Sequence, residues 1–281
     1  MPNSHSTVDH QIFISIVTYY PHLAELNSTL KSLKMAVDDA YQKHSIKVKI
    51  IVVDNSVNTE IAAQISALLQ KYFSGTSEII CSVSNVGYGA GHNLASLTAY
   101  SQWHLIMNAD VELDVDVLSS ALSFLKHSDN QAVGLISPQC KTADGKSSYL
   151  CKRYPCVLDL ALRGFAPEWL KKIFRKRLDN YEYRHETELQ QVKKVTIASG
   201  CFMFLRGEVW RKIGGFSPDY FLYFEDFDLC MKLNKVSSIT YVPDMRIVHH
   251  GGNAAGKGLR HVFLFVRSAF YFFSKHGWRF L

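Results

Sequence analysis

Three carboxylates stand within four residues in the last third of the chain. The segment YFEDFDLC, residues 223–230, holds Glu225, Asp226 and Asp228 among aromatic and apolar side chains. Burying an unpaired carboxylate is costly, so a purely structural segment gains little from this arrangement. A site that removes a proton or holds a cation has a good reason for it. We expect Asp226 to act as a general base, with Glu225 as its neighbour and Asp228 in a structural role.

The aromatic flank of these acids indicates what the site binds. An N-cap followed by acids in the first helical turn would account for one or two carboxylates. It would not account for the surrounding Phe221, Tyr223, Phe224 and Phe227. Sugars bind on aromatic platforms, so the flank favours a carbohydrate acceptor.

A second acidic cluster, NADVE at residues 108–112, follows an apolar stretch. Mg²⁺ and Mn²⁺ prefer oxygen ligands and commonly bridge one or two carboxylates to substrate phosphates. Asp110 could hold such a metal, and Glu112 points the same way by the period of two along a strand. A helix N-terminal turn containing Asp114 and Asp116 explains the cluster equally well, so both interpretations stay open.

A glycine-rich turn, NVGYGAGHN at residues 85–93, separates a strand from a helix. Backbone amides at such a turn can cradle a phosphate. The turn imitates a dinucleotide-binding fingerprint, with Asp110 near the expected position of its ribose-binding acid. However, the glycines alternate, and His92 occupies the place of the last fingerprint glycine. A plain tight turn explains the same residues.

Two adjacent histidines, His249 and His250, end a strand and precede the loop Gly251-Gly252-Asn253. A histidine there could complete a metal site or contact phosphate. A solvent-facing or core histidine is the alternative, and the sequence does not choose between the two residues.

The elements that position these residues alternate between strand and helix. Strands are expected at 12–18, 48–53, 78–83, 105–107, 195–205 and 246–248, and helices at 23–41, 61–72, from 87 onward and from 225 onward. This order predicts an α/β domain with a mainly parallel sheet and right-handed crossovers. Ligands bind at the carboxyl ends of such strands. Thr18, Asp54, Asn85 and Asp110 all fall there.

Composition limits the class of protein. The chain of 281 residues is 47% hydrophobic and 20% charged, with a net charge of +6, and no linker divides it, so we expect one domain. Its six cysteines lack Cys-x-x-Cys spacing, which indicates reduced thiols in a cytoplasmic protein. The first ten residues are polar, so no signal peptide is expected. No apolar run reaches the ~20 residues of a membrane-spanning helix.

Two segments combine basic and aromatic residues at helical spacing, 169–177 and 259–278. Such helices suit a membrane interface. Packing on the core with the basic residues in solvent is the alternative, and the sequence leaves both open.

In this order, the motifs resemble glycosyltransferase family 2, closest to the branch of bacterial rhamnosyltransferases that build cell-surface polysaccharide. The resemblance spans about residues 12–275 and rests on ISIVTY (14–19), VDNS (53–56), NVGYG (85–89), LIMNAD (105–110), Gly200, GGF (214–216), FEDFDLC (224–230) and His249.

The resemblance implies the GT-A fold, a single Rossmann-like mixed sheet flanked by helices. Residues 10–116 would form the nucleotide-sugar-binding half of one domain spanning 1–281. Residues 117–281 would form the acceptor-binding half, with a C-terminal amphipathic helix. Donor contacts would come from Thr18, Tyr19, Asp54, Asn85, Gly87, Asn93, Asn108 and Asp110.

The resemblance also implies a chemistry. Asp110 would hold Mg²⁺ or Mn²⁺, with His249 as a further ligand, although Asn108 replaces the first acid of the family's motif. Asp226 would deprotonate an acceptor hydroxyl that displaces the nucleotide diphosphate with inversion. The family often carries a serine after the histidine, where this chain has Asn253 and Ala254. The expected donor is dTDP-rhamnose or a UDP-sugar, and the expected acceptor is a glycan or lipid-linked sugar at the inner face of the plasma membrane.

Two other classes of protein remain. A nicotinamide-dependent oxidoreductase would explain the glycine-rich turn and Asp110, but it leaves Glu225 and Asp226 without a role. A non-catalytic carbohydrate-binding protein would use the aromatic residues but has no need of Asp226. Nucleic-acid binding is not expected, because the basic residues fall in short amphipathic segments without a recognised motif.

Overall fold

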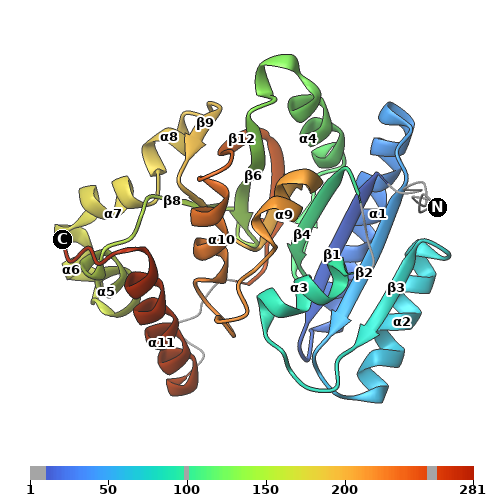
Figure 1. The fold of residues 1–281 in the computed structure, drawn as a ribbon, viewed down its shortest axis with the longest axis horizontal. Coiled ribbons are helices and arrows are strands. Elements are labelled where there is room, and N and C mark those ends of the chain that lie inside the picture. Colours follow the sequence, from blue (N-terminus) through green and yellow to red (C-terminus); the bar gives the residue numbers. More distant parts are fainter. Residues whose placement is uncertain (1–10, 98–100, 252–257) are drawn as a thin grey trace, which may run out of the picture.

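The computed structural model describes residues 11–97, 101–251 and 258–281. Its centre is a ten-stranded sheet (Figure 1). The strands follow the order β3 (Ser77–Cys81), β2 (Val48–Asp54), β1 (Ile12–Thr18), β4 (Trp103–Asn108), β11 (Phe202–Arg206), β6 (Val133–Thr142), β12 (Ser238–His249) and β5 (Val111–Leu113), with β7 (Ser147–Ser148) beside β6 and β9 (Lys193–Val195) beside β12. A separate two-stranded ribbon joins β8 (Cys151–Lys152) to β10 (Ile197–Ala198).

The sheet is parallel in its first half and mixed in its second. Strands β3, β2, β1 and β4 are parallel, as the alternating pattern predicts. Strand β11 then runs antiparallel to both β4 and β6, whereas β12 is parallel to β6. The expectation of a mainly parallel sheet therefore holds only as far as β4, and the mixed sheet implied by the family resemblance is confirmed.

The helices lie on both faces of the sheet and at its far end. They are α1 (Leu23–His44), α2 (Thr59–Phe73), α3 (Tyr88–Ser96), α4 (Val117–Lys126), a short 3-10 turn (Ser128–Asn130), α5 (Val157–Phe165), α6 (Glu168–Ile173), α7 (Arg175–Tyr181), α8 (Arg184–Glu188), α9 (Gly207–Ile213), α10 (Glu225–Leu233) and α11 (Leu259–His276). Helices α5, α6, α7 and α11 gather at the end of the molecule opposite α2 and β3 (Figure 1).

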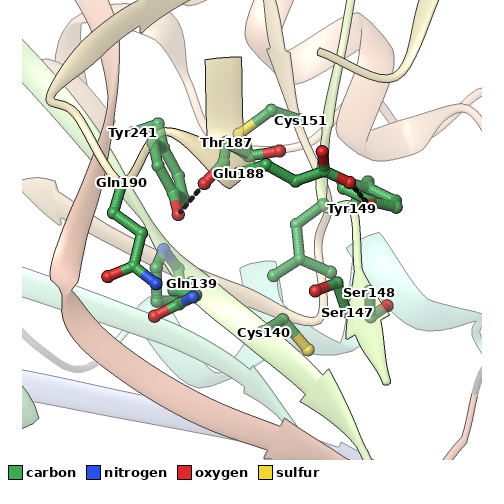
Figure 2. Close-up of a pocket in the computed structure, with 12 residues that line it drawn as sticks. Gln139, Cys140, Ser147, Ser148, Tyr149, Cys151, Thr187, Glu188, Gln190 and Tyr241 are labelled. Atoms are coloured by element: carbon green, nitrogen blue, oxygen red, sulfur yellow. Dashed lines mark hydrogen bonds between the residues drawn. The ribbon is translucent and has the colours of Figure 1, made fainter. Parts of the chain in front are cut away.

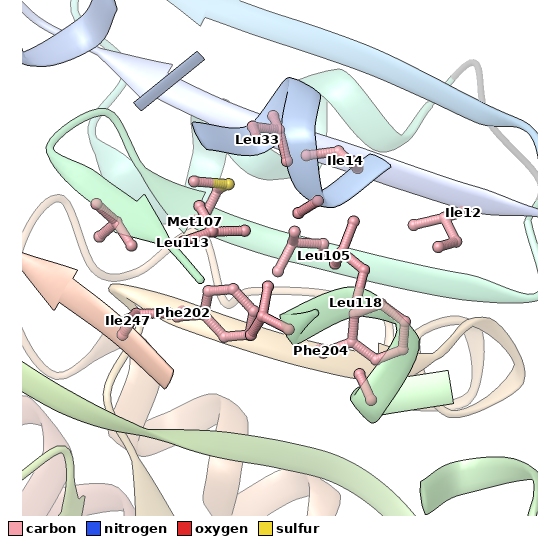
Figure 3. Close-up of a cluster of buried hydrophobic side chains, with 14 of the residues drawn as sticks. Ile12, Ile14, Leu33, Leu105, Met107, Leu113, Leu118, Phe202, Phe204 and Ile247 are labelled. Carbon is pink, nitrogen blue, oxygen red and sulfur yellow. The ribbon is translucent and has the colours of Figure 1, made fainter. Parts of the chain in front are cut away.

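The core forms because the central strands are buried on both faces, which explains their continuous β-branched sequences. Ile12, Ile14 and Ile16 of β1 belong to one buried cluster with Leu30 and Leu33 of α1 (Figure 3). Each such side chain contributes roughly 1.5–3 kcal/mol when it is fully removed from water. This packing fixes β1, and therefore fixes where its carboxyl end presents Thr18.

Two expected elements differ from the structure. The single strand expected at 195–205 is divided. The N–H of Ser199 bonds to the Leu150 carbonyl and the N–H of Gly200 bonds to Asp226, so neither pairs with a strand of the ten-stranded sheet. The amphipathic helix expected at 169–177 breaks at Phe174, which ends α6 and precedes α7. The C-terminal helix is confirmed as α11. In the part of the chain that the structure describes, no helix is long and apolar enough to cross a membrane.

Candidate active site

The carboxyl ends of β2, β1 and β4 lie side by side, and β12 ends beside them. The register pairs Thr18 with Asp54, and Val17 with Asn108. Because β5 pairs antiparallel with β12, His249 lies opposite Val111 and next to Asp110. Residues distant in sequence therefore meet at one edge of the sheet, where the alternating pattern predicts a ligand.

Asp110 and His249 face each other across this edge. Oδ1 of Asp110 lies 3.2 Å from Nε2 of His249, and Nδ2 of Asn108 lies 3.3 Å from the same nitrogen. Burial raises the pKa of Asp110. The hydrogen bond and charge of His249, together with the Asn108 amide, lower it by a larger amount, so the net pKa lies below its usual value. Asp110 is therefore ionised at neutral pH.

This pair could hold a divalent cation. Two cis ligands at about 2.1 Å from an octahedral Mg²⁺ lie about 3 Å apart, close to the 3.2 Å between these two atoms. Oδ1 of Asp110 is buried, and apart from the 3.2 Å contact with His249 it has no hydrogen-bond partner among the described residues. In those residues, no group of three or more histidine, cysteine or acidic side chains could hold a metal. Substrate phosphate and water would therefore supply the remaining ligands, as is usual for Mg²⁺.

Gly251 brings the loop after β12 into contact with Asp110. A Cβ at this position would lie 2.2 Å from Oδ2 of Asp110 and 3.3 Å from Nε2 of His249. Only glycine therefore allows the backbone to approach the carboxylate this closely. Gly252, Asn253 and Ala254, named in the sequence analysis, lie outside the described residues.

Glu112 and His250 form a second, separate pair. Oε1 of Glu112 lies 2.9 Å from Nε2 of His250, and both side chains are partly exposed. The structure therefore places His249 rather than His250 against Asp110. Glu112, expected to point the same way as Asp110, instead has His250 as its partner. Helix α4 begins only after Asp116, so Asp110 does not lie in a helical turn.

Asp226 and Glu225 begin α10 after two residues with positive φ, Tyr223 at 69° and Phe224 at 63°. Non-glycine residues rarely adopt this conformation, and such strain concentrates at functional sites. Oδ2 of Asp226 accepts the Gly200 N–H at 2.9 Å, and Oδ1 accepts the Phe227 N–H at 2.9 Å. The turn therefore orients the Asp226 carboxylate through two backbone donors.

The two acids differ in accessibility. Glu225 is 5% exposed, and its Oε2 has no hydrogen-bond partner among the described residues. Burial, followed by the charge of Asp226, raises the pKa of Glu225 to about 8. Burial also raises the pKa of Asp226, opposed by the N–H groups of Gly200 and Phe227. Asp226 is partly exposed whereas Glu225 is buried, so Asp226 is the more accessible acid of the pair.

Tyr88 connects the acidic clusters. Its hydroxyl donates to the Gly200 carbonyl at 2.6 Å. Burial raises the pKa of Tyr88 well above its usual value, and charges on Glu225, Asp226 and Asp110 add to the effect. The charges of all three acids therefore reach this one tyrosine. Tyr88 belongs to the glycine-rich motif, but its sequence context predicts no role for it.

The expected nucleotide residues form an organised turn. Oδ1 of Asp54 accepts hydrogen bonds from the Thr18 hydroxyl at 3.0 Å, the Ser56 N–H at 3.1 Å and the Ser56 hydroxyl at 2.6 Å. Asp54 is 1% exposed, whereas Tyr19 is 55% exposed. Asp54 therefore stabilises the ends of β1 and β2, and Tyr19 offers an aromatic ring to solvent beside them.

The glycine-rich turn packs against the loop before α10. Asn85 accepts the Gly87 N–H at 2.9 Å, and a Cβ at Gly87, whose φ is 88°, would lie 2.2 Å from the Phe221 carbonyl oxygen. Asn93 bonds through both amide atoms to the backbone of Phe216, at 2.9 Å each. This gives Asn93 a structural task, and its expected contact with a donor stays a prediction.

Lys152 was not predicted as a site residue, because a single lysine in a segment rich in charged residues carries no sequence signal. It is 5% exposed, and burial lowers its pKa to about 8. Its ammonium donates to the Tyr149 carbonyl and lies 3.8 Å from Glu182. The positive charge of Lys152 reaches Asp226, where it favours the ionised carboxylate.

A small polar pocket lies between β6 and α8 (Figure 2). Its volume is about 130 Å³. At its wall, the Tyr241 hydroxyl donates to the Thr187 carbonyl, and the Tyr149 hydroxyl donates to Glu188. Ligand pockets usually span about 300–1,000 Å³. Because none of the predicted site residues lines it, this pocket is not the site described above.

Known proteins are similar to this chain over the region that contains these motifs. A sequence profile described as "Glycosyl transferase family 2" matches residues 15–214. An N-acetylglucosaminyl-diphospho-decaprenol L-rhamnosyltransferase of Mycobacterium tuberculosis is 25% identical over 256 residues, covering 86% of this chain and 76% of that protein. Rhamnosyltransferase WbbL of Escherichia coli K12 is 25% identical over 252 residues, covering 85% and 83%.

Solved structures share the fold at low identity. The mannosyltransferase PcManGT from Pyrobaculum calidifontis, in complex with GDP-Man and Mn²⁺, has a TM-score of 0.55 at 16% identity, covering 89% of this chain and 60% of that one. GalNAc-T7 with UDP, GalNAc and Mn²⁺ has a TM-score of 0.59 at 13% identity, covering 86% and 44%. This chain spans less than two thirds of either structure, and the likeness shows the GT-A fold.

Proposed function

We infer, from the premise that the chain belongs to glycosyl transferase family 2, that it is an inverting glycosyltransferase using a nucleotide-diphosphate sugar and a divalent cation. The observation that carries the proposal is the pairing of a partly exposed Asp226 with a buried Glu225, both close enough to Tyr88 for their charges to act on it, as does the charge of Asp110 beside His249. An oxidoreductase would have no use for this pair, and a binding protein would have no need of a base.

Asp226 is proposed as the base. Its carboxylate takes the proton of an acceptor hydroxyl, and the hydroxyl oxygen attacks the anomeric carbon of the donor. The bond from that carbon to the diphosphate oxygen breaks on the opposite face, so the configuration inverts and the nucleotide diphosphate leaves. The N–H groups of Gly200 and Phe227 hold the carboxylate in place during the transfer.

Asp110 and His249 would hold Mg²⁺ or Mn²⁺. When bound, the cation stabilises the negative charge that develops on the departing diphosphate. Asp110 is ionised, as a metal ligand must be. Asn108 lies 3.3 Å from Nε2 of His249 and would release this nitrogen when it binds the cation.

Residues 10–116 are proposed as the nucleotide-sugar-binding half. Thr18 and Asp54 organise the turn against which the base and ribose would lie, and Tyr19 is exposed for contact with them. Asn85 and Gly87 shape the neighbouring turn. Residues 117–281, which contain Asp226, would bind the acceptor.

Rhamnose is the proposed sugar, with dTDP-rhamnose the leading donor and UDP-sugars the alternative. The proposal is supported by the two rhamnosyltransferases that are similar to this chain over most of its length. One of them is described as acting on a diphospho-decaprenol sugar, which supports a lipid-linked acceptor here.

A peripheral contact with the inner membrane face is also proposed. Helix α11 buries Phe272 and Phe273 but exposes an outer stripe, defined as Leu259, Phe263, Val266 and Phe270. These four side chains are spaced at helical intervals and are each more than half exposed, beside Arg260 and Arg267. Apolar and basic residues on one exposed helix suit anionic lipid. Co-sedimentation with phosphatidylglycerol vesicles, lost in Phe263→Glu, would support this contact; equal sedimentation of that variant would overturn it.

Isothermal titration with dTDP-rhamnose and several UDP-sugars tests the function. The wild-type protein should bind one donor with Mn²⁺ and bind it much more weakly with EDTA. Failure to bind any donor in either condition would contradict the transferase proposal and favour a carbohydrate-binding protein.

A further inference from the structure

We propose that the chain binds a prenyl diphosphate, with the diphosphate in a cavity formed by Arg153, Arg177 and Arg279 and the hydrocarbon chain in an adjoining apolar groove. The proposal rests on the proposed lipid-linked acceptor and names the site that would hold its lipid carrier. Residues of α5 and α7 line the cavity, and residues of α5 and α11 line the groove. These helices gather at one end of the molecule (Figure 1).

The cavity has the size and charge of an anion site. Its volume is about 520 Å³, within the range of ligand pockets. Three arginines and one carboxylate, Asp159, line it. Guanidinium groups bind phosphate oxygens through paired N–H donors, which is why arginine is frequent where phosphates are recognised.

The arginines differ in how far they are neutralised. Arg153 bonds to Glu186 at 2.7 Å, and Arg177 bonds to Asp159 at 2.5 Å. The guanidinium of Arg279 stacks on the ring of Tyr154 at 4.4 Å and has no carboxylate within ion-pair distance in the described residues. Arg279 therefore brings an unneutralised positive charge to the cavity.

An unpaired polar group lies in the same wall. Tyr181 lines the cavity, is 2% exposed, and its hydroxyl has no hydrogen-bond partner among the residues described. A buried hydroxyl without a partner costs stability. A phosphate oxygen in the cavity would be such a partner.

The apolar groove adjoins the cavity through a shared wall. The Val157 N–H donates to the Arg279 carbonyl at 2.8 Å, and the Leu158 N–H donates to the Phe280 carbonyl at 3.2 Å. Val157 and Trp278 face the groove, whereas their chain neighbours Cys156 and Arg279 face the cavity. An anionic head and a hydrocarbon tail joined by one bond could therefore occupy both.

The groove itself suits a branched hydrocarbon chain. It holds about 220 Å³ between α5 and α11, and every residue that lines it is apolar. Its walls include Leu160, Phe165, Phe265, Val266, Phe270 and Trp278. Because Val266 and Phe270 also belong to the outer stripe, the groove opens on the face proposed to contact the membrane.

The ribbon of β8 and β10 connects the cavity to the proposed base. Thr196, at the start of this ribbon, and Arg153, after β8, line the cavity. Four residues after Thr196, Gly200 donates its N–H to Asp226. Four residues of extended strand span about 13 Å, from Thr196 to Gly200. A sugar attached to a diphosphate in the cavity is therefore proposed to extend toward Asp226.

Titration of the purified full chain with farnesyl diphosphate in EDTA tests the proposal. The wild type should bind farnesyl diphosphate more tightly than either farnesol or inorganic diphosphate. Arg279→Gln should weaken binding about tenfold, because it removes one charge-assisted contact. The matched control Lys212→Gln, which removes an exposed charge on α9, should bind like the wild type.

A second pair of variants tests the groove. Val266→Glu places a carboxylate at the groove and should weaken farnesyl diphosphate binding, whereas Ser274→Glu, exposed on the same helix but outside both the groove and the outer stripe, should not. Absence of wild-type binding, or equal binding by Arg279→Gln and Lys212→Gln, would overturn the proposal. Donor titration with Mn²⁺ in the same preparations separates the two ideas: donor binding without farnesyl diphosphate binding rejects this site and leaves the proposed function intact.

Discussion

His276 of α11 and Asp228 of α10 share a hydrogen bond of 2.8 Å between Nε2 and Oδ1, and Lys275 lies 2.8 Å from the same oxygen. Asp228 is fully buried and lies two residues after Asp226. The C-terminal helix is thereby tied to the turn that presents the proposed base. Ser268 adds a hydrogen bond to the Leu222 carbonyl at 2.8 Å.

Phe272 completes this attachment, and its truncation should destabilise the protein. It is fully buried and packs on Phe224, with ring centroids 5.4 Å apart. Phe272→Ala should lower the free energy of unfolding by about 3–5 kcal/mol, through lost burial and the cavity left behind. Phe263→Ala, 66% exposed on the same helix, should change it by no more than about 0.5 kcal/mol. Urea denaturation measures both, and equal effects would contradict this packing.

Asp226→Asn should reduce transfer by a factor of roughly 10²–10⁴ while donor binding survives. The Gly200 and Phe227 N–H groups bind different oxygens of Asp226, so the single oxygen of asparagine keeps one of these hydrogen bonds, and the amide cannot take a proton. Single-turnover transfer and donor titration would separate the two effects. The matched control Asp219→Asn removes an acid on the loop before α10, which bonds to Tyr271 at 2.6 Å, and should retain activity. Parallel loss of transfer and donor binding in Asp226→Asn would refute its role as base.

The two adjacent histidines provide a paired test of the metal site. His249→Gln should weaken Mn²⁺-dependent donor binding at least about tenfold, because it removes one of two protein ligands. His250→Gln should leave that binding near the wild-type value, because His250 contacts Glu112 instead. Asp110→Asn should behave like His249→Gln. If His250→Gln were the more damaging histidine variant, the assignment would be reversed.

Gly251→Ala should weaken donor binding without removing any ligand. The new Cβ would meet Oδ2 of Asp110 at 2.2 Å, so either the carboxylate or the loop must move. Gly164→Ala is the matched control, because no atom lies within 4 Å of its new Cβ. Mn²⁺-dependent donor titration measures both variants. Normal binding by Gly251→Ala would show that the loop does not need to approach Asp110.

Much of this arrangement is predictable from the sequence. Continuous β-branched runs predict β1 and β2, because both faces of these strands are buried. The polar residues that follow these strands lie at one edge of the sheet. The choice between His249 and His250 was not predictable, because it depends on the pairing of β12 with β5, a contact across more than a hundred residues. The sequence also placed Glu225 and Asp226 together but could not show that only Asp226 is reachable.

The wild type should lose stability as pH rises because of Glu225, and Glu225→Gln should not show this loss. The pKa of Glu225 is about 8 in the folded protein, against an ordinary value of 4.5, because burial and then the charge of Asp226 disfavour its ionised form. Below pH 4.5 the group is protonated in both states, and its contribution to stability is fully present. Between about 4.5 and 8 the unfolded chain ionises while the folded one does not, so stability falls by up to about 1.4 kcal/mol per pH unit.

Glutamine resembles the protonated carboxyl and does not titrate, so the comparison isolates this group. The melting temperature of Glu225→Gln, relative to the wild type, should rise from pH 4.5 to about 8 and then level off. Glu208→Gln, which changes an exposed acid on α9, should show no such trend. A constant difference between Glu225→Gln and the wild type across this range would mean that Glu225 is ionised in the folded protein, and the proposed proton on the buried acid would have to be abandoned.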